Sequence, residues 1–450
     1  MSQYRAYPAY KDSGIEWIGQ VPEHWQVKRL KHLISQCQNG VWGDDPLEDG
    51  SDTLCIRVAD FDRDNNVVIY NPSTYRQITK EHQDSRLVSK GDILLEKSGG
   101  GAQTLVGANV RYLGEEPAVC SNFVAVIKPS KMAESAWLNY LMASMYALKI
   151  NLRSIKQSTG IQNLDSEQYL DEGVAAPSLD EQATIAAALD RETARIDALV
   201  EKKTRFIELL KEKRQALITH AVTKGLDRNA KMKDSGIEWI GQVPEHWEAT
   251  KLKHVAAFSG GGTPSKENPD YWNGCIPWVS PKDMKHEVIT DSIDHITTKG
   301  LENSATKLID SGAVLLVARS GILRHTIPVG INNVPVSLNQ DMKALSLDET
   351  RVRPRFILRW VQGLNRSLLG IWAKEGATVE SLEHEYVANT RLPLPDLKEQ
   401  DAILATLDLE TARIDALISK TEQSITLLKE RRAAFITAAV TGQIDLRGKQ

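Results

Sequence analysis

The sequence predicts two globular domains of mixed α/β (α+β) class, joined by two long helices that form an antiparallel coiled coil, in a circular, pseudo-two-fold arrangement. Three observations lead to this prediction. Segment 11–25 returns letter for letter at 233–247, a shift of 222 residues. Segment 192–199 returns at 410–417, a shift of 218 residues. The stretches between these two kinds of block share almost nothing, so a constant frame holds two different inserts.

The helices are predicted from a start signal and a seven-residue ladder. Ser178 and Asp396 each follow a proline and precede a glutamate by three positions, an arrangement in which each side chain satisfies the other's free backbone N–H. The ladder is apolar except for one polar rung at the same place in each copy: Leu189, Ile196, Lys203, Leu210 and Leu217, then Leu407, Ile414, Thr421, Leu428 and Phe435. A single helix of this kind would pack against its own domain, but two equivalent copies favour antiparallel pairing, with ends near Ala221 and Ala439.

The order of the blocks predicts the circular arrangement. In mid-chain, segment 223–227 leads directly into the second copy of the first block, whereas the matching segment 441–445 stands at the C-terminal end and the first copy lies near the N-terminus. If the two ends meet in space, two identical partner subunits can dock on the equivalent halves. The expected domains are 1–176 and 227–394, with repeated segments 11–25 and 233–247, and the expected helical regions are 177–226 and 395–450.

The inserts, about residues 26–176 and 248–394, predict short strands followed by an amphipathic helix. Strands are expected at 53–58, 92–96 and 123–127 in the first insert, and at 276–279, 313–317 and 343–347 in the second. The helices are expected near 137–150 and 355–369.

Composition excludes several classes of protein. No segment of the 450 residues is apolar for long enough to cross a bilayer, and the N-terminal residues lack a signal-peptide core, so a cytoplasmic protein without a membrane partner is expected. Four cysteines stand far apart without metal-ligand spacing. The net charge of −4 for the whole chain argues against a nucleic-acid partner. Acidic residues crowd the repeated helices, however, and the net charge hides this uneven distribution.

Polar, glycine-rich loops follow strands at comparable places in the two inserts. Segments 96–103 and 318–324 each place a basic residue, Ser and Gly after a strand end, and segments 38–42 and 259–265 form a second pair. Glycine lets the backbone approach a phosphate, and Lys or Arg supplies the charge. Such loops can also be plain turns. The strongest basic cluster is Arg351-Val-Arg-Pro-Arg355 with Arg359, and a solvated helix start explains it equally well.

Motifs of catalysis are missing from the chain. Segment 268–271 lacks the second proline of the Asn-Pro-Pro-Tyr loop of amino-methyltransferases, and no glycine-rich cofactor fingerprint precedes it. There is no phosphate loop, and Glu96-Lys97 after Asp92 lacks the spacing of a nuclease site. His24 and His246 belong to the repeated block, where packing is a more common role than metal ligation. We therefore expect no catalytic and no metal-binding residues.

The repeated blocks resemble the specificity subunit of type I restriction-modification systems. The resemblance rests on the segment Asp12–Trp25 and its copy, on Pro-x-Leu-x-Glu-Gln-x-x-Ile at 177–185 and 395–403, and on Glu-Thr-Ala-Arg-Ile-Asp-Ala-Leu. The second insert also resembles a common recognition-domain pattern, in 261–265, 271–278, 319–321 and 339–341. The first insert departs from that pattern, which leaves its contact residues less defined.

The resemblance implies a non-enzymatic subunit that binds double-stranded DNA. Each insert would be a target-recognition domain that reads one half of a bipartite, asymmetric site, and the helices would set the spacer. Two modification subunits would bring S-adenosylmethionine, and restriction subunits would bring ATP, Mg and the nuclease, so this chain itself would bind no cofactor. Two alternatives stay open: a self-sufficient adenine DNA methyltransferase and a protein-only coiled-coil scaffold.

The candidate DNA-binding residues come from the polar loops of both inserts. They are Trp42, Arg57, Lys97, Ser98, Gly99, Gln103 and Asn122 in the first insert, and Gly262, Thr263, Ser265, Trp278, Lys282, Arg319, Ser320, Arg324, Asn339 and Gln340 in the second.

Overall fold

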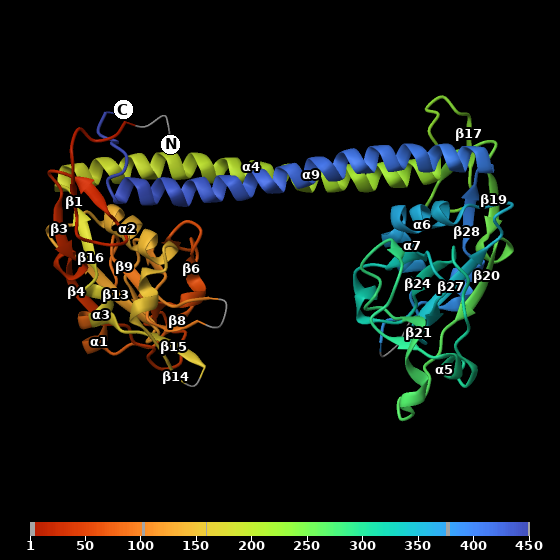
Figure 1. The fold of residues 1–450 in the computed structure, drawn as a ribbon, viewed down its shortest axis with the longest axis horizontal. Coiled ribbons are helices and arrows are strands. Elements are labelled where there is room, and N and C mark those ends of the chain that lie inside the picture. Colours follow the sequence, from red (N-terminus) through yellow and green to blue (C-terminus); the bar gives the residue numbers. More distant parts are fainter. Residues whose placement is uncertain (1–4, 101–103, 159, 375–378, 449–450) are drawn as a thin grey trace. The chain divides into compact units, whose positions relative to one another are not determined.

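The computed structural model describes residues 5–100, 104–158, 160–374 and 379–448. The chain forms two compact units, Met1–Lys203 with Gln423–Gln450 and Thr204–Glu422, hereafter unit 1 and unit 2. Each unit therefore combines one globular domain with part of both long helices, α4 (Leu179–Lys224) and α9 (Leu397–Val440) (Figure 1).

Unit 1 is built around a six-stranded sheet with the order β4-β13-β9-β11-β7-β6. Its strands are β4 (Ile34–Asn39), β13 (Val124–Pro129), β9 (Ile93–Glu96), β11 (Asn109–Arg111), β7 (Val67–Val68) and β6 (Phe61–Asp62). Beside it lie the sheets β12 (Ala118–Cys120)-β5 (Thr53–Ile56)-β8 (Tyr75–Arg76) and β10 (Ser98–Gly99)-β15 (Ile161–Leu164)-β14 (Ile155–Ser158). The pairs β1 (Tyr10–Asp12)-β2 (Gln20–Pro22) and β3 (Gln26–Arg29)-β16 (Gly173–Ala176), with α1 (Lys80–Arg86), α2 (Ser135–Ala147) and α3 (Ser166–Leu170), complete it.

Unit 2 repeats this plan with a five-stranded sheet in the order β20-β27-β24-β25-β22. The strands are β20 (Ala256–Gly260), β27 (Met342–Leu347), β24 (Val314–Val317), β25 (Val329–Asn332) and β22 (Val288–Ile289). The smaller sheets are β23 (His295–Ile296)-β21 (Trp272–Val279)-β26 (Ser337–Leu338), β19 (Glu248–Lys251)-β28 (Arg391–Leu394) and β17 (Met232–Asp234)-β18 (Gln242–Pro244). The short helices are α5 (Thr298–Glu302), α6 (Pro354–Gly363), α7 (Asn365–Trp372) and α8 (His384–Asn389).

The two sheets have the same topology although their sequences differ. In both, the first four strands pair antiparallel in the listed order, and the next strand pairs parallel to the fourth, β7 with β11 and β22 with β25. In both, a strand of the adjoining small sheet pairs parallel to its neighbour, β5 with β12 and β21 with β26. The predicted mixed α/β class is confirmed for both inserts, and the predicted strands overlap observed ones with bounds that agree to within four residues.

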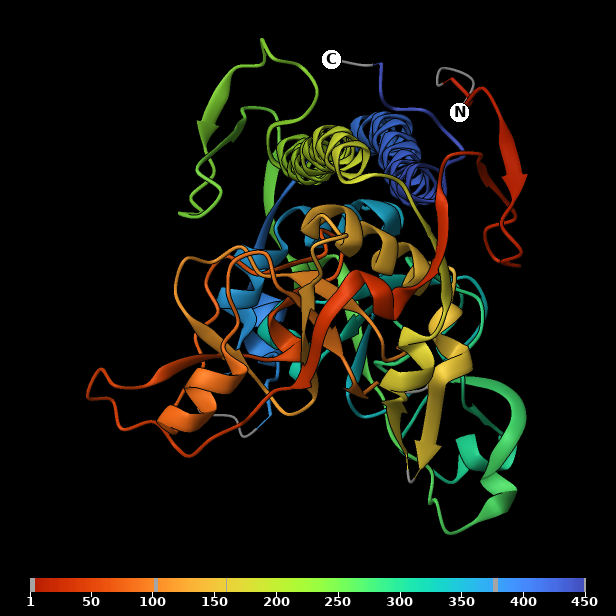
Figure 2. The same cartoon turned by 90° about the vertical axis from the view of Figure 1, so that its left-hand side faces the viewer.

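The long helices pair antiparallel within each unit. In unit 1, Arg432 near the end of α9 contacts Asp197 of α4 at 3.0 Å. In unit 2, the equivalent Arg214 of α4 contacts Asp415 of α9 at 3.1 Å. A single hydrophobic core joins the domain of unit 1 to its helices, and Trp25, Trp137, Leu189 and Phe435 all lie in it. Figure 2 shows α2 between the helix pair and the sheet of this unit, where Tyr140 donates to Asp190 at 2.7 Å.

The two ends of the chain meet in unit 1, as the circular order of the blocks predicts. The backbone N–H of Asp445 donates to the carbonyl of Arg5 over 2.8 Å, and the guanidinium of Arg447 lies 4.7 Å from the ring centre of Tyr7. Gly442, with φ of 76°, turns the chain after α9 just as Gly225, with φ of 72°, turns it after α4. Both positions lie in the left-handed region that favours glycine.

The predicted helix at 355–369 is wrong in one respect, because it is broken into α6 and α7 at Leu364. The cause lies in α4. Thr219 Oγ1 and Gln215 Nε2 both donate to the carbonyl of Gly363, the latter over 2.9 Å. A carbonyl that accepts these side chains is diverted from the regular ladder of a helix, and the chain bends there.

The two inserts share few letters, yet part of the frame recurs in their backbone. Ile155 of β14 pairs with Leu164 of β15 in unit 1, and Ala373 pairs with Leu382 in unit 2 at the same shift of 218 residues. The ion pair of Lys156 with Asp165, at 2.7 Å, recurs as Lys374 with Glu383, at 3.4 Å. The constant frame therefore extends into each domain.

No helix in the described part of the chain is both long and apolar enough to span a membrane.

Candidate nucleic-acid interface

Most of the candidate residues of the first insert line one open pocket of about 530 Å³ in unit 1. Four separate segments meet there because β5 and β12 pair in parallel and therefore end at the same edge, next to the end of β9. Trp42, Arg57, Ser98, Gly99 and Asn122 all lie at its rim or wall. The exposed Phe123 adds a second aromatic side chain to that of Trp42.

The charged groups around this pocket are tied to polar partners. Lys97 donates to Asn39 Oδ1 over 2.6 Å, and Ser98 donates to Asn163 Oδ1 over 2.7 Å. The guanidinium of Arg57 lies 3.5 Å from the buried Asp60, yet 41% of its side chain is exposed. Such a side chain can leave a weak intramolecular contact for a base edge or a phosphate. Gln103, the remaining candidate of this insert, lies outside the described residues.

The pocket also contains Glu96, which sequence reasoning did not select. Its side chain is almost wholly buried, and Arg63 Nη2 approaches Glu96 Oε2 to 2.7 Å. Burial raises the pKa of the Glu96 carboxyl, and the nearby Arg63 opposes this shift. A long-range partner of this kind leaves no local signal in the sequence.

The candidates of the second insert converge at the equivalent edge of unit 2. Thr263 Oγ1 contacts Gln340 Oε1, and the indole of Trp278 donates to the carbonyl of Gly262 over 2.9 Å. Arg319 Nε donates to Asp341 Oδ1 over 2.6 Å, and Asn339 Nδ2 lies 3.4 Å from the other oxygen of that carboxylate. Arg319, Asn339, Gln340, Thr263 and Trp278 are thus brought together by three loops and one strand.

The remaining candidates lie around this group. Ser265 accepts, through its carbonyl, a 3.1 Å bond from Trp272, whose ring stands edge-on to that of Trp278. Ser320 begins the short helix η6 (Gly321–Arg324) and accepts from its backbone. Arg324 donates to Glu380, and this bond holds the pKa of the Glu380 carboxyl below its usual value. Lys282 is exposed after β21 and has no side-chain partner in the described part of the chain.

The basic cluster 351–359 serves the fold and is not a free surface. Arg353 makes two hydrogen bonds of 3.0 and 3.1 Å to Asp401, and Arg355 contacts Asp408 at 2.7 Å, so both anchor the domain of unit 2 to α9. Arg359 is buried and contacts Glu287 at 2.8 Å. The cluster does stand at the start of α6, where the Arg355 side chain is 51% exposed, but α9 supplies carboxylate partners that the local sequence does not reveal.

Strand β15 lies beside the candidate residues, and sequence reasoning did not select it. It pairs with β10, the strand that carries Ser98 and Gly99, and segment 379–382 contacts Arg319 and Ser320 in the same way. The loops that carry Ser98 and Arg319 are therefore each flanked by a piece of the constant frame. Among the described residues, no three His, Cys, Asp or Glu side chains are grouped to hold a metal ion.

A family profile described as "Type I restriction modification DNA specificity domain" matches residues 22–209 and 244–427. The chain is 31% identical over 225 residues to the specificity subunit of the type I restriction enzyme EcoR124I/EcoR124II of Escherichia coli, covering 50% of this chain and 48% of that one. It thus spans about half the length of that relative. A specificity subunit of the type I restriction enzyme MjaVIII from Methanocaldococcus jannaschii is 22% identical over 446 residues, which is 95% of this chain and 94% of the relative.

Two solved structures have the same fold. A chain from a study of complex assembly and conformational transition of the type I R-M system has a TM-score of 0.71 at 16% identity, covering 96% of this chain and 99% of its own. The HsdS subunit from Thermoanaerobacter tengcongensis has a TM-score of 0.57 at 17% identity, covering 94% and 98%.

Proposed function

The chain belongs to the type I restriction-modification DNA specificity family, and on that premise we propose that it is the subunit that selects the DNA sequence for a type I complex. Each domain reads one half of a bipartite, asymmetric site in double-stranded DNA. The observation that carries this proposal is the convergence of two different residue sets at the same edge of two equally folded domains.

The differences between the two edges support two different half-sites. In unit 1 the edge presents Trp42, Arg57 and Asn122 around a hollow, whereas in unit 2 it presents Arg319, Asn339 and Gln340 around Asp341. Arginine recognises guanine and asparagine or glutamine recognises adenine through paired hydrogen bonds in the major groove. Because the scaffold is shared and the side chains are not, the two domains select different bases.

Two modification subunits dock on equivalent helix surfaces, one on each unit. Leu199 of α4 and Leu427 of α9 are 36% and 64% exposed in unit 1, and their counterparts at the 218-residue shift, Leu417 and Leu209, are each 46% exposed in unit 2. Exposed leucines at matching positions of a repeated frame indicate a partner that both halves share. These subunits bring S-adenosylmethionine and the methylating site, restriction subunits bring ATP and Mg, and this chain binds none of them. The complex works on DNA in the cytoplasm.

The test is genome-wide detection of methylated adenine in cells that carry this chain with its modification subunit. We expect one bipartite sequence to be methylated, and none when the modification subunit is expressed without this chain. Calorimetry of the purified chain with S-adenosylmethionine should show no saturable binding. Saturable binding at one site per chain would support a self-sufficient methyltransferase. If no adenine is methylated but the subunits still assemble without DNA, the result would support a scaffold.

A further inference from the structure

A basic cleft of about 1030 Å³ lies in unit 2, where the C-terminal half of α4 faces α6 and α7. Its lining includes six basic side chains: Arg214, Lys285, His286, Arg324, His325 and Arg366. Glu287 is the one carboxylate among the described residues that line it, and this carboxylate is already engaged, at 2.8 Å by Arg359 and at 2.9 Å by Gln362. Lysine and arginine therefore outnumber carboxylates in this lining by four to one.

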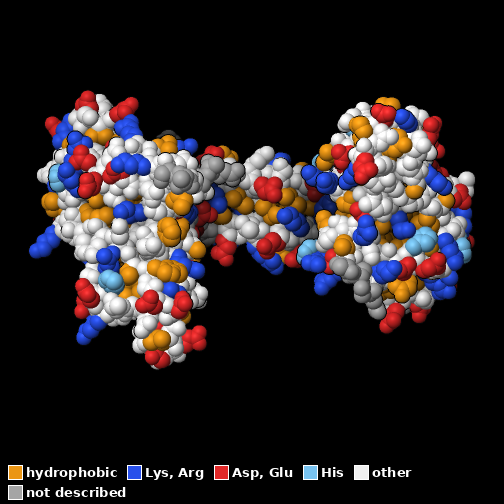
Figure 3. All heavy atoms as spheres, turned by 90° about the horizontal axis from the view of Figure 1, so that it is seen from below, with side chains coloured by type: hydrophobic (Ala, Val, Ile, Leu, Met, Phe, Trp, Pro, Cys, Tyr) orange, Lys and Arg blue, Asp and Glu red, His pale blue; other side chains and the backbone are white. Residues whose placement is uncertain are grey.

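Four of these basic side chains are available to a ligand. Lys285, His286, His325 and Arg366 are exposed, and their side chains make no ion pair or hydrogen bond with the described residues. Figure 3 shows Lys, Arg and His side chains on the visible face of this unit, with Asp and Glu side chains among them. The other two guanidiniums are engaged, Arg214 with Asp415 at 3.1 Å and Arg324 with Glu380.

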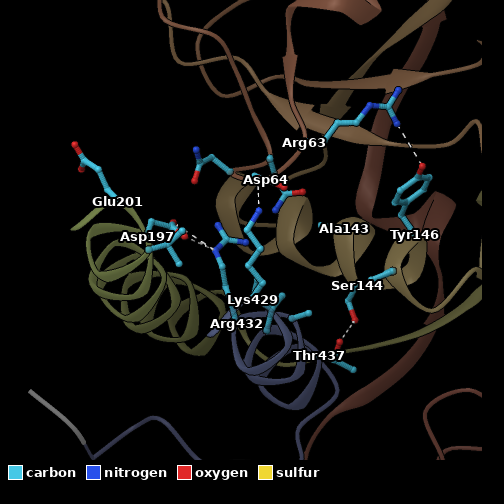
Figure 4. Close-up of a pocket in the computed structure, with 16 residues that line it drawn as sticks. Arg63, Asp64, Ala143, Ser144, Tyr146, Asp197, Glu201, Lys429, Arg432 and Thr437 are labelled. Atoms are coloured by element: carbon cyan, nitrogen blue, oxygen red, sulfur yellow. Dashed lines mark hydrogen bonds and ion pairs between the residues drawn. The ribbon is translucent and has the colours of Figure 1, made fainter. Parts of the chain in front are cut away.

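The equivalent cleft of unit 1 is neutral, which shows that the fold does not require this charge. It measures about 390 Å³, and its helix residues Arg432, Ile436 and Thr437 match Arg214, Ile218 and Thr219 at the 218-residue shift. The cations of this cleft are paired with acids, as Figure 4 shows. Lys429 contacts Asp64 at 3.0 Å, and Arg432 contacts Asp197 at 3.0 Å. In unit 2 the ion pair of Arg432 with Asp197 recurs as Arg214 with Asp415, but the lining of the cleft holds more cations than carboxylates.

The basic cleft continues directly from the loop that carries Arg319, which under the proposed function is the reading loop of the second domain. Arg319 and Ser320 precede η6, and Arg324 and His325, at the end of η6, line the cleft. A duplex whose base edges face Arg319 therefore has backbone phosphates within reach of this lining. Lys and Arg bind phosphate without regard to sequence and release condensed counterions when they do so.

We propose that this cleft binds the phosphate backbone of the duplex beside the half-site that the second domain reads. The inference rests on the proposed function and adds an anchor that is independent of sequence and present in one half only. Lys285 and Arg366 supply the free charges, and Arg324 joins the anchor to the reading loop. The two halves of the site are thus held with unequal strength.

The test compares the double variant Lys285→Glu/Arg366→Glu with the matched control Lys233→Glu/Lys398→Glu. The control reverses two exposed lysines of unit 2 that lie outside the cleft and have no side-chain partner among the described residues. Binding of the full chain to a 40-base-pair duplex of random sequence is measured by fluorescence anisotropy from 50 to 200 mM salt. We expect the cleft variant to bind about tenfold more weakly, with a salt slope shallower by about two phosphate contacts, each of about 0.9. The control should change neither quantity as much.

Several outcomes would overturn the inference. An equal loss in the control would show a general charge effect, and an unchanged salt slope would show that the cleft does not touch phosphate. A cleft variant that binds duplex normally but no longer retains the modification subunit would assign the cleft to a protein. The neutral variant Lys285→Gln/Arg366→Gln, with an unchanged melting temperature, should give a smaller loss in the same direction. If the wild-type chain binds no duplex and directs no methylation, the proposed function itself fails.

Discussion

Glu181 accepts a hydrogen bond of 3.2 Å from the indole of Trp25, which lies 156 residues earlier in the chain. The same carboxylate accepts from Tyr7 Oη at 2.8 Å and contacts His24 Nε2 at 2.8 Å. In unit 2, Glu399 is held in the same way by Trp247 at 3.0 Å and His246 at 2.8 Å. This joint ties the first repeated block to the start of a long helix, which explains why both are repeated together. Only one of the two hydrogen bonds of each predicted capping box therefore forms, because the glutamate carboxylate accepts from these donors and not from the backbone N–H of the capping residue.

Replacing Glu181 with alanine should destabilise unit 1 by about 2–3 kcal/mol, because it leaves buried donors without an acceptor. The equivalent Glu399→Ala should cost less, since 25% of the Glu399 side chain is exposed, against 6% for Glu181. Thermal unfolding of both variants measures the difference. Equal losses in the two units would contradict the argument from burial.

Arg319→Ala should weaken binding to the recognised site by about 1–3 kcal/mol, because a base edge loses its donor. The Arg319 side chain is 52% exposed and held by Asp341 alone among the described residues, so its removal leaves the fold intact. Competition with a random duplex is the measurement. A similar loss on every sequence would show that Arg319 contacts only phosphate.

Exchanging residues 26–176 for the insert of another family member should change one half-site and leave the other intact. The cut points suit this exchange because β3 and β16 pair with each other, with Gln26 opposite Ala176, so both ends of the insert leave the frame at one place. Methylome sequencing of cells with the chimera gives the new site. A change in both halves would refute modular reading.

How far the sequence predicts this molecule depends on how far apart the interacting residues lie. In the sequence, strands such as β24 can be recognised as local apolar runs. The loop at Ser98 can be recognised because the second insert has a matching serine directly after Arg319. The break at Leu364 is not visible, because Thr219 of α4 causes it. The hairpin at Ile161 escaped notice because few letters match its copy, although the register is the same. Convergence at the candidate site depends on parallel pairing, which local patterns do not encode.

Cysteine reactivity should separate the inner from the outer thiols. Burial raises the pKa of Cys55 to about 11, so at pH 8 its thiolate is scarce and protected, whereas Cys275 is exposed. A chromogenic disulfide reagent should therefore label Cys275 quickly in the native chain, and Cys275→Ser should remove the fast phase. Because the raised pKa keeps Cys55 protonated, its labelling should rise only as the pH approaches that value. Rapid labelling of Cys55 at pH 8 would contradict its burial.

The long helices should act as a ruler for the unread base pairs between the half-sites. The boundary between the units falls at Lys203 and Thr204 in α4 and at Glu422 and Gln423 in α9, so an insertion there leaves the contacts within each unit unchanged. Four added residues in both helices lengthen each by about 6 Å. At about 3.4 Å per base pair, this corresponds to between one and two base pairs.

The methylated sequence of the insertion variant decides whether the ruler operates. We expect the same two half-sites with a longer gap, because the reading loops of both units are untouched. An insertion in α4 alone serves as the control, since it shifts the pairing of the two helices and should reduce activity without giving a defined new gap. The variant with insertions in both helices is expected to lose part of its affinity, because the added turn also rotates one domain around the duplex. An unchanged gap in a still-active matched variant would show that the helices do not set the spacing.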